Sequence, residues 1–178
     1  MNLEPFDILL TDLPVVFCGI NPSVQAGETG HNFGSASNRF WRTLHRSGFT
    51  PSLLSAADDR SILRYGFGIT ATATRPTRRA SEVTAAELRS AADSFGRKMQ
   101  YFRPKTIAFL GKPAFAALIG SAKFDWGPQP STFVGAKAWV LPNPSGLNRA
   151  FCLDRLVQAY SVLRASTANA LEAWRQRH

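Results

Sequence analysis

The chain has 178 residues, 44% of them apolar, and this size and composition predict one domain, residues 1–178, with one substantial core. Its formal net charge of +9, carried mostly by arginine, exceeds what solubility needs and favours a polyanionic partner such as nucleic acid. Two cysteines are too few for a zinc or iron–sulfur site, no apolar run could span a membrane, and residues 1–14 are acidic rather than basic, so we expect a cytoplasmic protein without metal, cofactor or membrane partner.

The first predicted element is a buried strand over residues 15–20, which are mostly β-branched, aromatic or otherwise apolar. Pro22 cannot join a β-ladder, so the strand must end at Asn21. Ligands of open α/β sheets bind beyond the carboxyl ends of the strands, and the glycine-rich loop that follows lets a ligand approach the backbone. This loop is a candidate ligand site, although an ordinary surface loop with an Asx turn would explain the same pattern.

Strands and helices alternate along the rest of the chain, which predicts an α/β fold. Further strands are expected at residues 67–72, 105–110, 133–134 and 137–141. Caps and apolar periodicity predict helices from Ser37 or Asn38 to Gly48, over 53–65, over about 18 residues from a Thr84–Glu87 capping box to Pro104, over 113–119 and over 151–164. The tail, residues 165–178, is expected to be helical or frayed beyond a core of about 15–164.

Two further loops follow predicted strands. Arg75-Pro76-Thr77-Arg78-Arg79 is strongly basic and could hold phosphate, or it could be a solvated turn. The second loop is Pro142-Asn143-Pro144-Ser145-Gly146-Leu147-Asn148-Arg149, which is rich in turn formers. If the sheet is parallel, both loops lie at the same edge as Asn21.

The loops Gly19-Ile20-Asn21-Pro22 and Asn143 to Arg149 together resemble the uracil-DNA glycosylase superfamily, in its mismatch-specific uracil/thymine branch. Four intervening blocks are similar to that branch in order and spacing: Asn38-Arg39-Phe40-Trp41, Arg75-Pro76-Thr77, Leu110-Gly111-Lys112 and Trp139-Val140-Leu141-Pro142. The resemblance covers about residues 15–164. It implies a single-domain three-layer α/β/α fold with a central, mainly parallel sheet of four to five strands.

The same resemblance implies a monofunctional DNA glycosylase whose partner is double-stranded DNA containing a G·U mismatch. We expect the protein to be a monomer. It would flip uracil out of the duplex and hydrolyse the N-glycosidic bond in base excision repair. Such an enzyme must fill the space that the base leaves, and an apolar wedge does this. Leu147, between Gly146 and the polar pair Asn148-Arg149, is placed for that role.

Site residues follow from the resemblance. Asn21 would orient the attacking water, and backbone N–H groups near Ile20 and Phe33 would hold the base oxygens. The Phe33 ring would stack on the flipped base. The remaining expected substrate contacts are Ser23, Ala26, His31 and Asn143, and the remaining expected DNA contacts are Ser145, Gly146, Asn148, Arg149, Arg75 and Arg78.

The mechanism has one weak point, because the oxygen of an amide such as Asn21 is hardly basic. Faster members of the superfamily carry Asp there. Glu28 and Asp93 are candidates to supply the missing carboxylate, although each could be a solvated surface group. Ala26 stands where narrower relatives carry Ser, so thymine or exocyclic cytosine adducts could also fit. A broader-specificity uracil glycosylase and a catalytically weak module that binds lesions or mismatches stay as alternatives.

Overall fold

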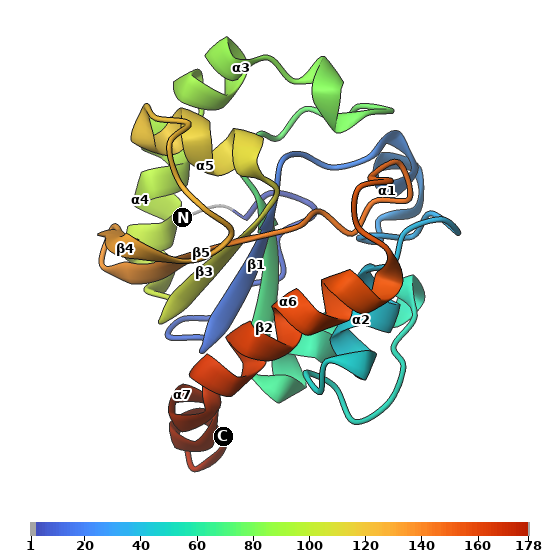
Figure 1. The fold of residues 1–178 in the computed structure, drawn as a ribbon, viewed down its shortest axis with the longest axis vertical. Coiled ribbons are helices and arrows are strands. Elements are labelled where there is room, and N and C mark those ends of the chain that lie inside the picture. The colour runs from blue at the N-terminus through green and yellow to red at the C-terminus, as the bar shows by residue number, and fades with distance from the viewer. Residues whose placement is uncertain (1–2, 178) are drawn as a thin grey trace.

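The computed structural model describes residues 3–177 and contains a five-stranded sheet in the order β2-β1-β3-β5-β4 (Figure 1). Strands β2, β1, β3 and β5 are parallel, and β4 pairs antiparallel with β5 at one edge. The predicted α/β fold with a mainly parallel sheet is confirmed. The strands are β1 (Val15–Gly19), β2 (Phe67–Ala71), β3 (Thr106–Leu110), β4 (Gly127–Phe133) and β5 (Ala136–Leu141).

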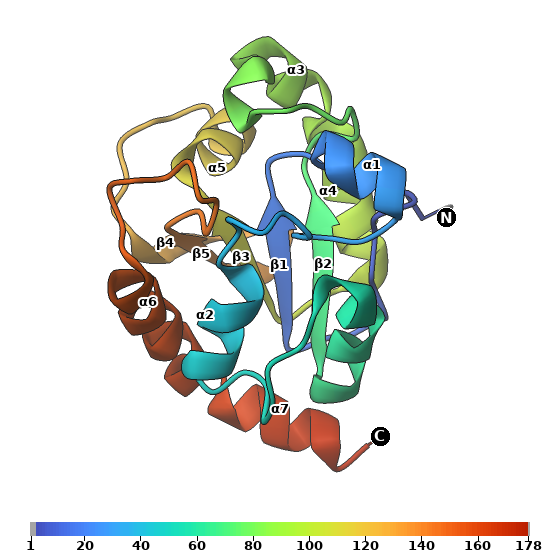
Figure 2. The same ribbon diagram turned by 90° about the vertical axis from the view of Figure 1, so that its right-hand side faces the viewer.

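Helices cover both faces of the sheet and complete the three expected layers (Figures 1 and 2). None of the helices in residues 3–177 combines the length and the apolar run that crossing a membrane requires. The α-helices are α1 (Val24–Thr29), α2 (Phe40–Arg46), α3 (Ala85–Ser90), α4 (Ala92–Phe102), α5 (Lys112–Ile119), α6 (Leu153–Ser166) and α7 (Ala168–Arg175), and the 3-10 segments are η1 (Ala56–Tyr65) and η2 (Ala80–Glu82).

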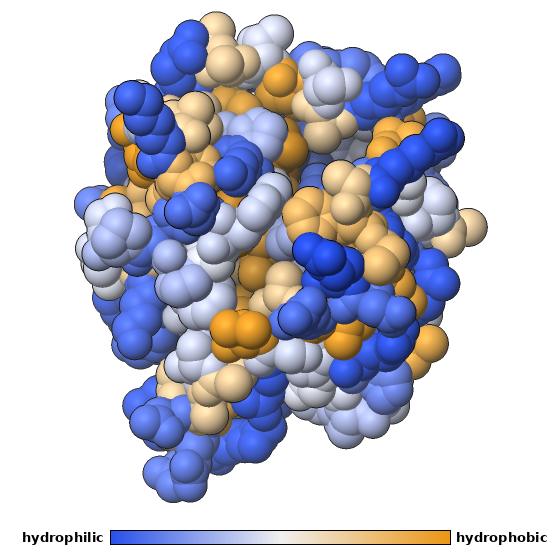
Figure 3. All heavy atoms as spheres, viewed as in Figure 1, coloured by the Kyte–Doolittle hydropathy of each residue, from blue (hydrophilic) through white to orange (hydrophobic). Residues whose placement is uncertain are grey.

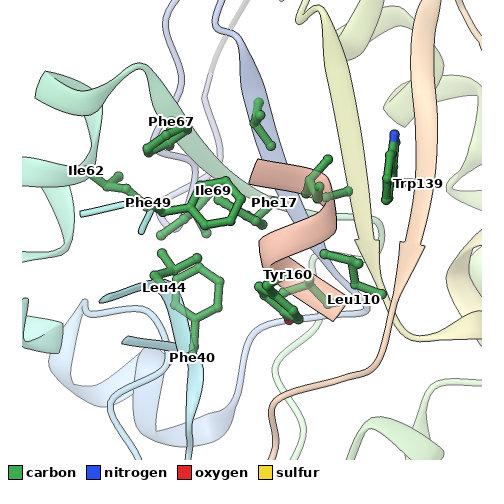
Figure 4. Close-up of a cluster of buried hydrophobic side chains, with 14 of the residues drawn as sticks. Phe17, Phe40, Leu44, Phe49, Ile62, Phe67, Ile69, Leu110, Trp139 and Tyr160 are labelled. Carbon is green, nitrogen blue, oxygen red and sulfur yellow. The ribbon is translucent and has the colours of Figure 1, made fainter. Parts of the chain in front are cut away.

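The core has two main halves because successive side chains of a strand point to opposite faces. Phe17 of β1 is fully buried on the face covered by α2 and α6, where it packs among Phe40, Phe49 and Tyr160 (Figure 4). Its neighbours Val16 and Cys18 face α4 and α5 instead. Burying one such large apolar side chain contributes about 1.5–3 kcal/mol, so these strands hold the sheet firmly beneath the loops at its edge.

The long helix expected after Thr84 is two helices, α3 and α4, and this prediction was wrong. Leu88 of α3 packs in a small cluster with Ala114 of α5, whereas Phe95 and Met99 of α4 pack against the sheet. The chain therefore breaks at Ala91 because its two halves bury their apolar faces against different neighbours. The segment expected to be helical over 53–65 is a 3-10 segment, η1.

Strand β4 begins at Gly127, six residues before the predicted start. The prediction missed these residues because Pro128 and Pro130 are not typical of a strand. An edge strand tolerates proline, since one of its sides needs no N–H donor. Its ladder is irregular between Pro128 and Thr132. The predicted tail is more ordered than expected, because α7 buries Leu171 and Trp174.

The four parallel strands all end at one edge of the sheet, and the segments that follow them lie together there. Loop 72–79, after β2, is joined to the segment after β1 by two backbone hydrogen bonds, from Thr77 N–H to the Pro22 carbonyl and from Val24 N–H to the Thr77 carbonyl, each 3.1 Å. The loop after β5 reaches the start of α2, where Arg39 N–H donates to the Pro144 carbonyl. Segments distant in sequence thus form one rim.

Candidate active site

A cavity of about 320 Å³ opens at this rim. Its wall includes nine of the sequence-predicted site residues, namely Ile20, Asn21, Ser23, Ala26, Phe33, Arg78, Asn143, Ser145 and Leu147. The sequence analysis missed several other lining residues, including Phe6, Asn32, Ser37, Asn38, Ile69, Thr70, Thr77 and Arg79. Residues from five separate segments of the chain therefore share one cavity.

The Asn21 amide is held in one orientation by the segments around it. Its Nδ2 donates to the Arg75 carbonyl at 2.8 Å, to the Pro22 carbonyl at 3.0 Å and to Thr77 Oγ1 at 2.7 Å. The Arg75 and Pro22 carbonyl oxygens can only accept hydrogen bonds, so it is Nδ2 of Asn21, and not Oδ1, that faces them. Asn21 Oδ1 makes no hydrogen bond within residues 3–177 and is left as a fixed acceptor at the cavity.

Phe33 has an unusual backbone, with φ of +56°, a region that bulky side chains rarely adopt. Its ring stacks on Phe40 of α2 with ring centroids 4.0 Å apart and an interplanar angle of 25°. The backbone N–H of Phe33 donates no hydrogen bond within residues 3–177. Such strain concentrates at functional sites, and here it aligns a ring and a free backbone donor along the cavity wall.

The segment after Asn21 was predicted to be a loop, and this prediction was wrong in part, because residues 24–29 form helix α1. Ser23 Oγ caps its N-terminus by accepting a hydrogen bond from Ala26 N–H at 3.1 Å, and Gly30 ends it in a left-handed conformation. Ser23 and Gly30 were the available cap signals. The helix buries Ala26, whose methyl group lines the cavity.

Phe6 reaches the cavity from the N-terminal segment, which is fastened to the sheet by a buried ion pair. The Asp7 carboxylate accepts hydrogen bonds from Lys98 Nζ of α4 at 3.0 and 3.1 Å and from Thr70 Oγ1 of β2 at 2.6 Å. Ile8 forms an isolated antiparallel bridge with Ile69. No local signal in the sequence links residues 6–8 to β2, so this wall could not be predicted.

The loop over residues 142–151, which we call the wedge loop, is closed by its own side chains. Asn143 Oδ1 accepts from Ser145 N–H at 2.9 Å, and Asn148 Nδ2 donates to the Asn143 carbonyl at 2.9 Å. The Asn148 amide thus shapes the loop. With its oxygen engaged, Asn143 presents Nδ2 as a donor without a hydrogen-bond partner in residues 3–177, beside the cavity.

Leu147 is raised at the tip of the wedge loop, where 66% of its surface is exposed. Beside it, the backbone of Gly146 lies directly against Ser37, and a Cβ atom placed on Gly146 would come within 2.5 Å of Ser37 Cβ. Glycine is needed for this close approach. An apolar side chain is therefore held in solvent at the mouth of the cavity.

The Arg39 side chain binds the wedge loop through its backbone carbonyls. The sequence analysis assigned this residue no role. Its guanidinium donates to the Pro144 carbonyl at 3.2 Å, the Ser145 carbonyl at 2.6 Å, the Asn148 carbonyl at 2.9 Å and the Phe151 carbonyl. Its backbone N–H also donates to Pro144. The rigid fork of an arginine suits such a set of diverging acceptors.

Seven predicted residues do not line the cavity, and four of them lie outside the wedge loop. Glu28 and Asp93 are exposed, on α1 and α4, so neither candidate carboxylate reaches the cavity beside Asn21. His31 turns its Nδ1 toward Asp59 at 3.8 Å. The Arg75 guanidinium pairs with the Glu87 carboxylate at 2.9 Å, which lowers the pKa of Glu87, and it is the Arg75 carbonyl that serves the site through Asn21.

Gly146, Asn148 and Arg149 belong to the wedge loop but stand outside the cavity wall. Arg149 is exposed, as are Arg78 and Arg79 on the opposite rim. One face of the molecule is largely hydrophilic, with small, separate apolar patches (Figure 3). Arginines on both sides of the mouth are suited to contact a phosphate backbone.

Residues 3–177 contain no group of three or more His, Cys, Asp or Glu side chains that could hold a metal ion. Cys18 lies at the end of β1 near the site, but burial raises the pKa of its thiol to about 12, so it is a poor nucleophile. The polar groups of the residues that line the cavity are thus amides, backbone groups, hydroxyls and the guanidinium groups of Arg78 and Arg79.

Comparison with known proteins agrees with this geometry. A family model described as the uracil DNA glycosylase superfamily matches residues 6–164. Among solved structures, the chain is similar to the solution NMR structure of a protein from Methanosarcina acetivorans described as a "putative uracil DNA glycosylase", with 19% sequence identity and a TM-score of 0.62. The match covers 89% of this chain and 94% of the other, and at this identity it supports the fold.

Proposed function

The chain belongs to the uracil DNA glycosylase superfamily, which implies hydrolysis of N-glycosyl bonds in DNA, and we propose that it removes uracil opposite guanine from duplex DNA. The observation that supports this proposal most directly is that a fixed polar acceptor and an exposed apolar side chain border the same cavity. On one side is Asn21, with a fixed and unpartnered Oδ1, and on the other is Leu147, exposed at the cavity mouth.

Breaking the N-glycosidic bond leaves an oxocarbenium-like sugar and a pyrimidine anion, so the site must stabilise the anion and position water. The free N–H of Phe33 and Nδ2 of Asn143 are donors at the cavity that suit the oxygens of the departing base. Asn21 Oδ1 can accept a hydrogen bond from water and so direct a lone pair of the water oxygen toward the sugar. This assignment needs no cofactor.

The cavity supplies no carboxylate to deprotonate the water, because no Asp or Glu of the described residues lines it. Water then attacks a sugar that already carries substantial positive charge, and it needs orientation more than activation. We expect a slow enzyme, since general-base catalysis typically contributes about 10²–10⁴-fold in rate.

Leu147 would enter the base stack as the uracil leaves it, and the wedge loop would meet the orphaned guanine. A flipped base costs less when its pair is mismatched, which favours G·U over A·U. The small, buried Ala26 leaves room for a substituent on the pyrimidine ring, so thymine and exocyclic cytosine adducts are proposed as secondary substrates. The monomeric state and the cytoplasmic location stay predictions.

Base release from G·U, A·U and G·T duplexes and from single-stranded uracil DNA tests the proposal. Purified protein with EDTA should produce alkali-labile abasic sites, fastest from G·U. Equal rates on single strands and on A·U would favour the broader-specificity glycosylase. Specific binding to G·U without any base release at enzyme excess would identify a lesion-binding module instead.

Replacing Leu147 with alanine should weaken base flipping, because an alanine cannot fill the space that the base leaves. We expect the fluorescence rise of 2-aminopurine placed next to the uracil to fall by about half or more, and base release to fall about tenfold, since truncating a large apolar side chain at a DNA step removes on the order of 1–3 kcal/mol. Val162→Ala, which truncates an exposed apolar residue on α6, is the control. An unchanged 2-aminopurine signal would contradict the wedge role.

A further inference from the structure

Asn32 is a buried residue of the cavity wall, with only 8% of its surface exposed, and it is anchored on several sides. Its backbone N–H donates to Asp59 Oδ2 at 2.8 Å, and its carbonyl accepts from Trp41 Nε1 at 3.3 Å. Its side-chain Nδ2 donates to the Phe6 carbonyl at 3.1 Å and to Asp59 Oδ2 at 3.3 Å. The residue has no freedom to turn.

These contacts decide which way the amide faces. The Phe6 carbonyl can only accept, and the Asp59 carboxylate accepts at the same end, so the nitrogen must point toward them. Asn32 Oδ1 is then on the opposite side, and it is the one polar atom of this residue without a hydrogen bond in residues 3–177. Unlike the rest of the residue, Asn32 Oδ1 is not sealed from solvent, and because Asn32 lines the cavity, a ligand there could donate a hydrogen bond to it.

We propose that Asn32 Oδ1 accepts a hydrogen bond from N3–H of the flipped pyrimidine and thereby selects uracil and thymine over cytosine. Uracil and thymine carry a proton on N3, whereas cytosine presents a lone pair there, which would face the oxygen and repel it. An exocyclic adduct closed over N3 and N4 of cytosine also lacks this proton, so among the secondary substrates proposed above it should be accepted less well than thymine. The donors proposed above, from Phe33 and Asn143, match the oxygens on either side of N3. This inference rests on the proposed function, because it names the base that the same cavity takes.

Asp59 acts through Asn32 and is a positioning residue. It lies on η1, 97% buried, and its Oδ2 receives both the backbone and the side-chain N–H groups of Asn32. Without this carboxylate, only the Phe6 carbonyl would hold Nδ2, and the Asn32 amide could more easily rotate and present Nδ2 to the cavity. A site built to pair with a buried polar group discriminates strongly against a ligand that leaves the group unpaired.

The test measures binding of duplexes that contain non-cleavable 2′-fluoroarabino uridine or cytidine. Each base lies opposite a tetrahydrofuran abasic residue, so that flipping breaks no base pair and the two affinities can be compared directly. The unaltered protein should bind the uridine duplex about tenfold or more tightly, the ratio expected when the bound base covers the Asn32 oxygen and either donates a hydrogen bond to it or leaves it unpaired. Asn32→Ala should bring the two affinities to within about twofold of each other. Asn169→Ala, which removes an exposed amide on α7, should keep the unaltered ratio.

Asn32→Ala should fold, because Asp59 keeps its hydrogen bond from the backbone N–H of residue 32. Asp59→Asn is a second variant, which offers a donor to Asn32 Oδ1 and should also reduce the uridine preference. A folded Asn32→Ala or Asp59→Asn protein that keeps the full preference overturns the inference, as does an unaltered protein without a preference. If the protein prefers uridine but releases no base from a cleavable G·U duplex, the proposed function fails and the recognition role of Asn32 stands.

Discussion

Asn21→Ala is expected to lower the single-turnover rate of base release from a G·U duplex by about 10²–10³-fold, the usual effect of removing one preorganised polar group from an active site. The variant removes Oδ1, the acceptor that orients water, while leaving the wedge loop and the rim arginines in place. Affinity for a duplex with non-cleavable 2′-fluoroarabino uridine opposite guanine should change less than about threefold, because Asn21 contributes to the reaction more than to binding.

A graded control separates the Asn21 oxygen from the contacts that hold it. Thr77→Val removes one of the three acceptors of Asn21 Nδ2 and leaves the Arg75 and Pro22 carbonyls in place. We expect its rate of base release to fall less than about tenfold, since the net value of one neutral hydrogen bond is about 0.5–1.5 kcal/mol. Base release by Asn21→Ala at the unaltered rate would show that another group orients the water.

Arg39→Ala should disorder the wedge loop and reduce base release by tenfold or more. The guanidinium donates to four carbonyls of the loop, and each hydrogen bond from a charged donor contributes about 1.5–3 kcal/mol. Without it, Leu147 has no fixed position over the cavity. The flipping signal from 2-aminopurine should fall together with the rate, whereas a purely structural role would lower the melting temperature and leave flipping by the folded protein intact.

Two companion variants separate geometry from charge. Arg42→Ala removes an exposed arginine one turn along α2 and should keep most of the flipping signal. Arg39→Lys keeps the charge but lacks the planar fork, so it should behave more like Arg39→Ala than like the unaltered protein. If lysine restores flipping fully, the charge alone is sufficient, and the hydrogen bonds of the guanidinium to the loop carbonyls are not what positions Leu147.

The strands of this fold were predictable because their signals are local. Buried parallel strands are short apolar runs, and β1, β2, β3 and β5 all begin and end within about one residue of their predicted positions. The errors fall where tertiary contacts decide. Leu88 and Phe95 lie seven residues apart in one periodic stripe, yet they pack against different neighbours and break the helix between them. In β4, two prolines conceal an edge strand.

The candidate site divides in the same way. The strand ends brought Asn21, Asn143 and Leu147 to one cavity, as the resemblance implied. Neither candidate carboxylate reaches the cavity: Glu28 and Asp93 have the right chemistry, but the helices that carry them place them in solvent away from it. Burial and direction depend on the packing of the whole chain, and a charge in a sequence indicates neither.

By itself, the sequence of this protein determined the parallel sheet, the strand ends that carry polar loops and the excess of arginine, because these depend on residue type and short-range spacing. Only the tertiary structure decided what holds each functional atom. The Asn21 amide is oriented by the Arg75 carbonyl, the wedge loop by Arg39, and Asn32 by Asp59. These contacts join segments 27 to 106 residues apart, mostly through backbone carbonyls, which every residue carries and no sequence pattern distinguishes.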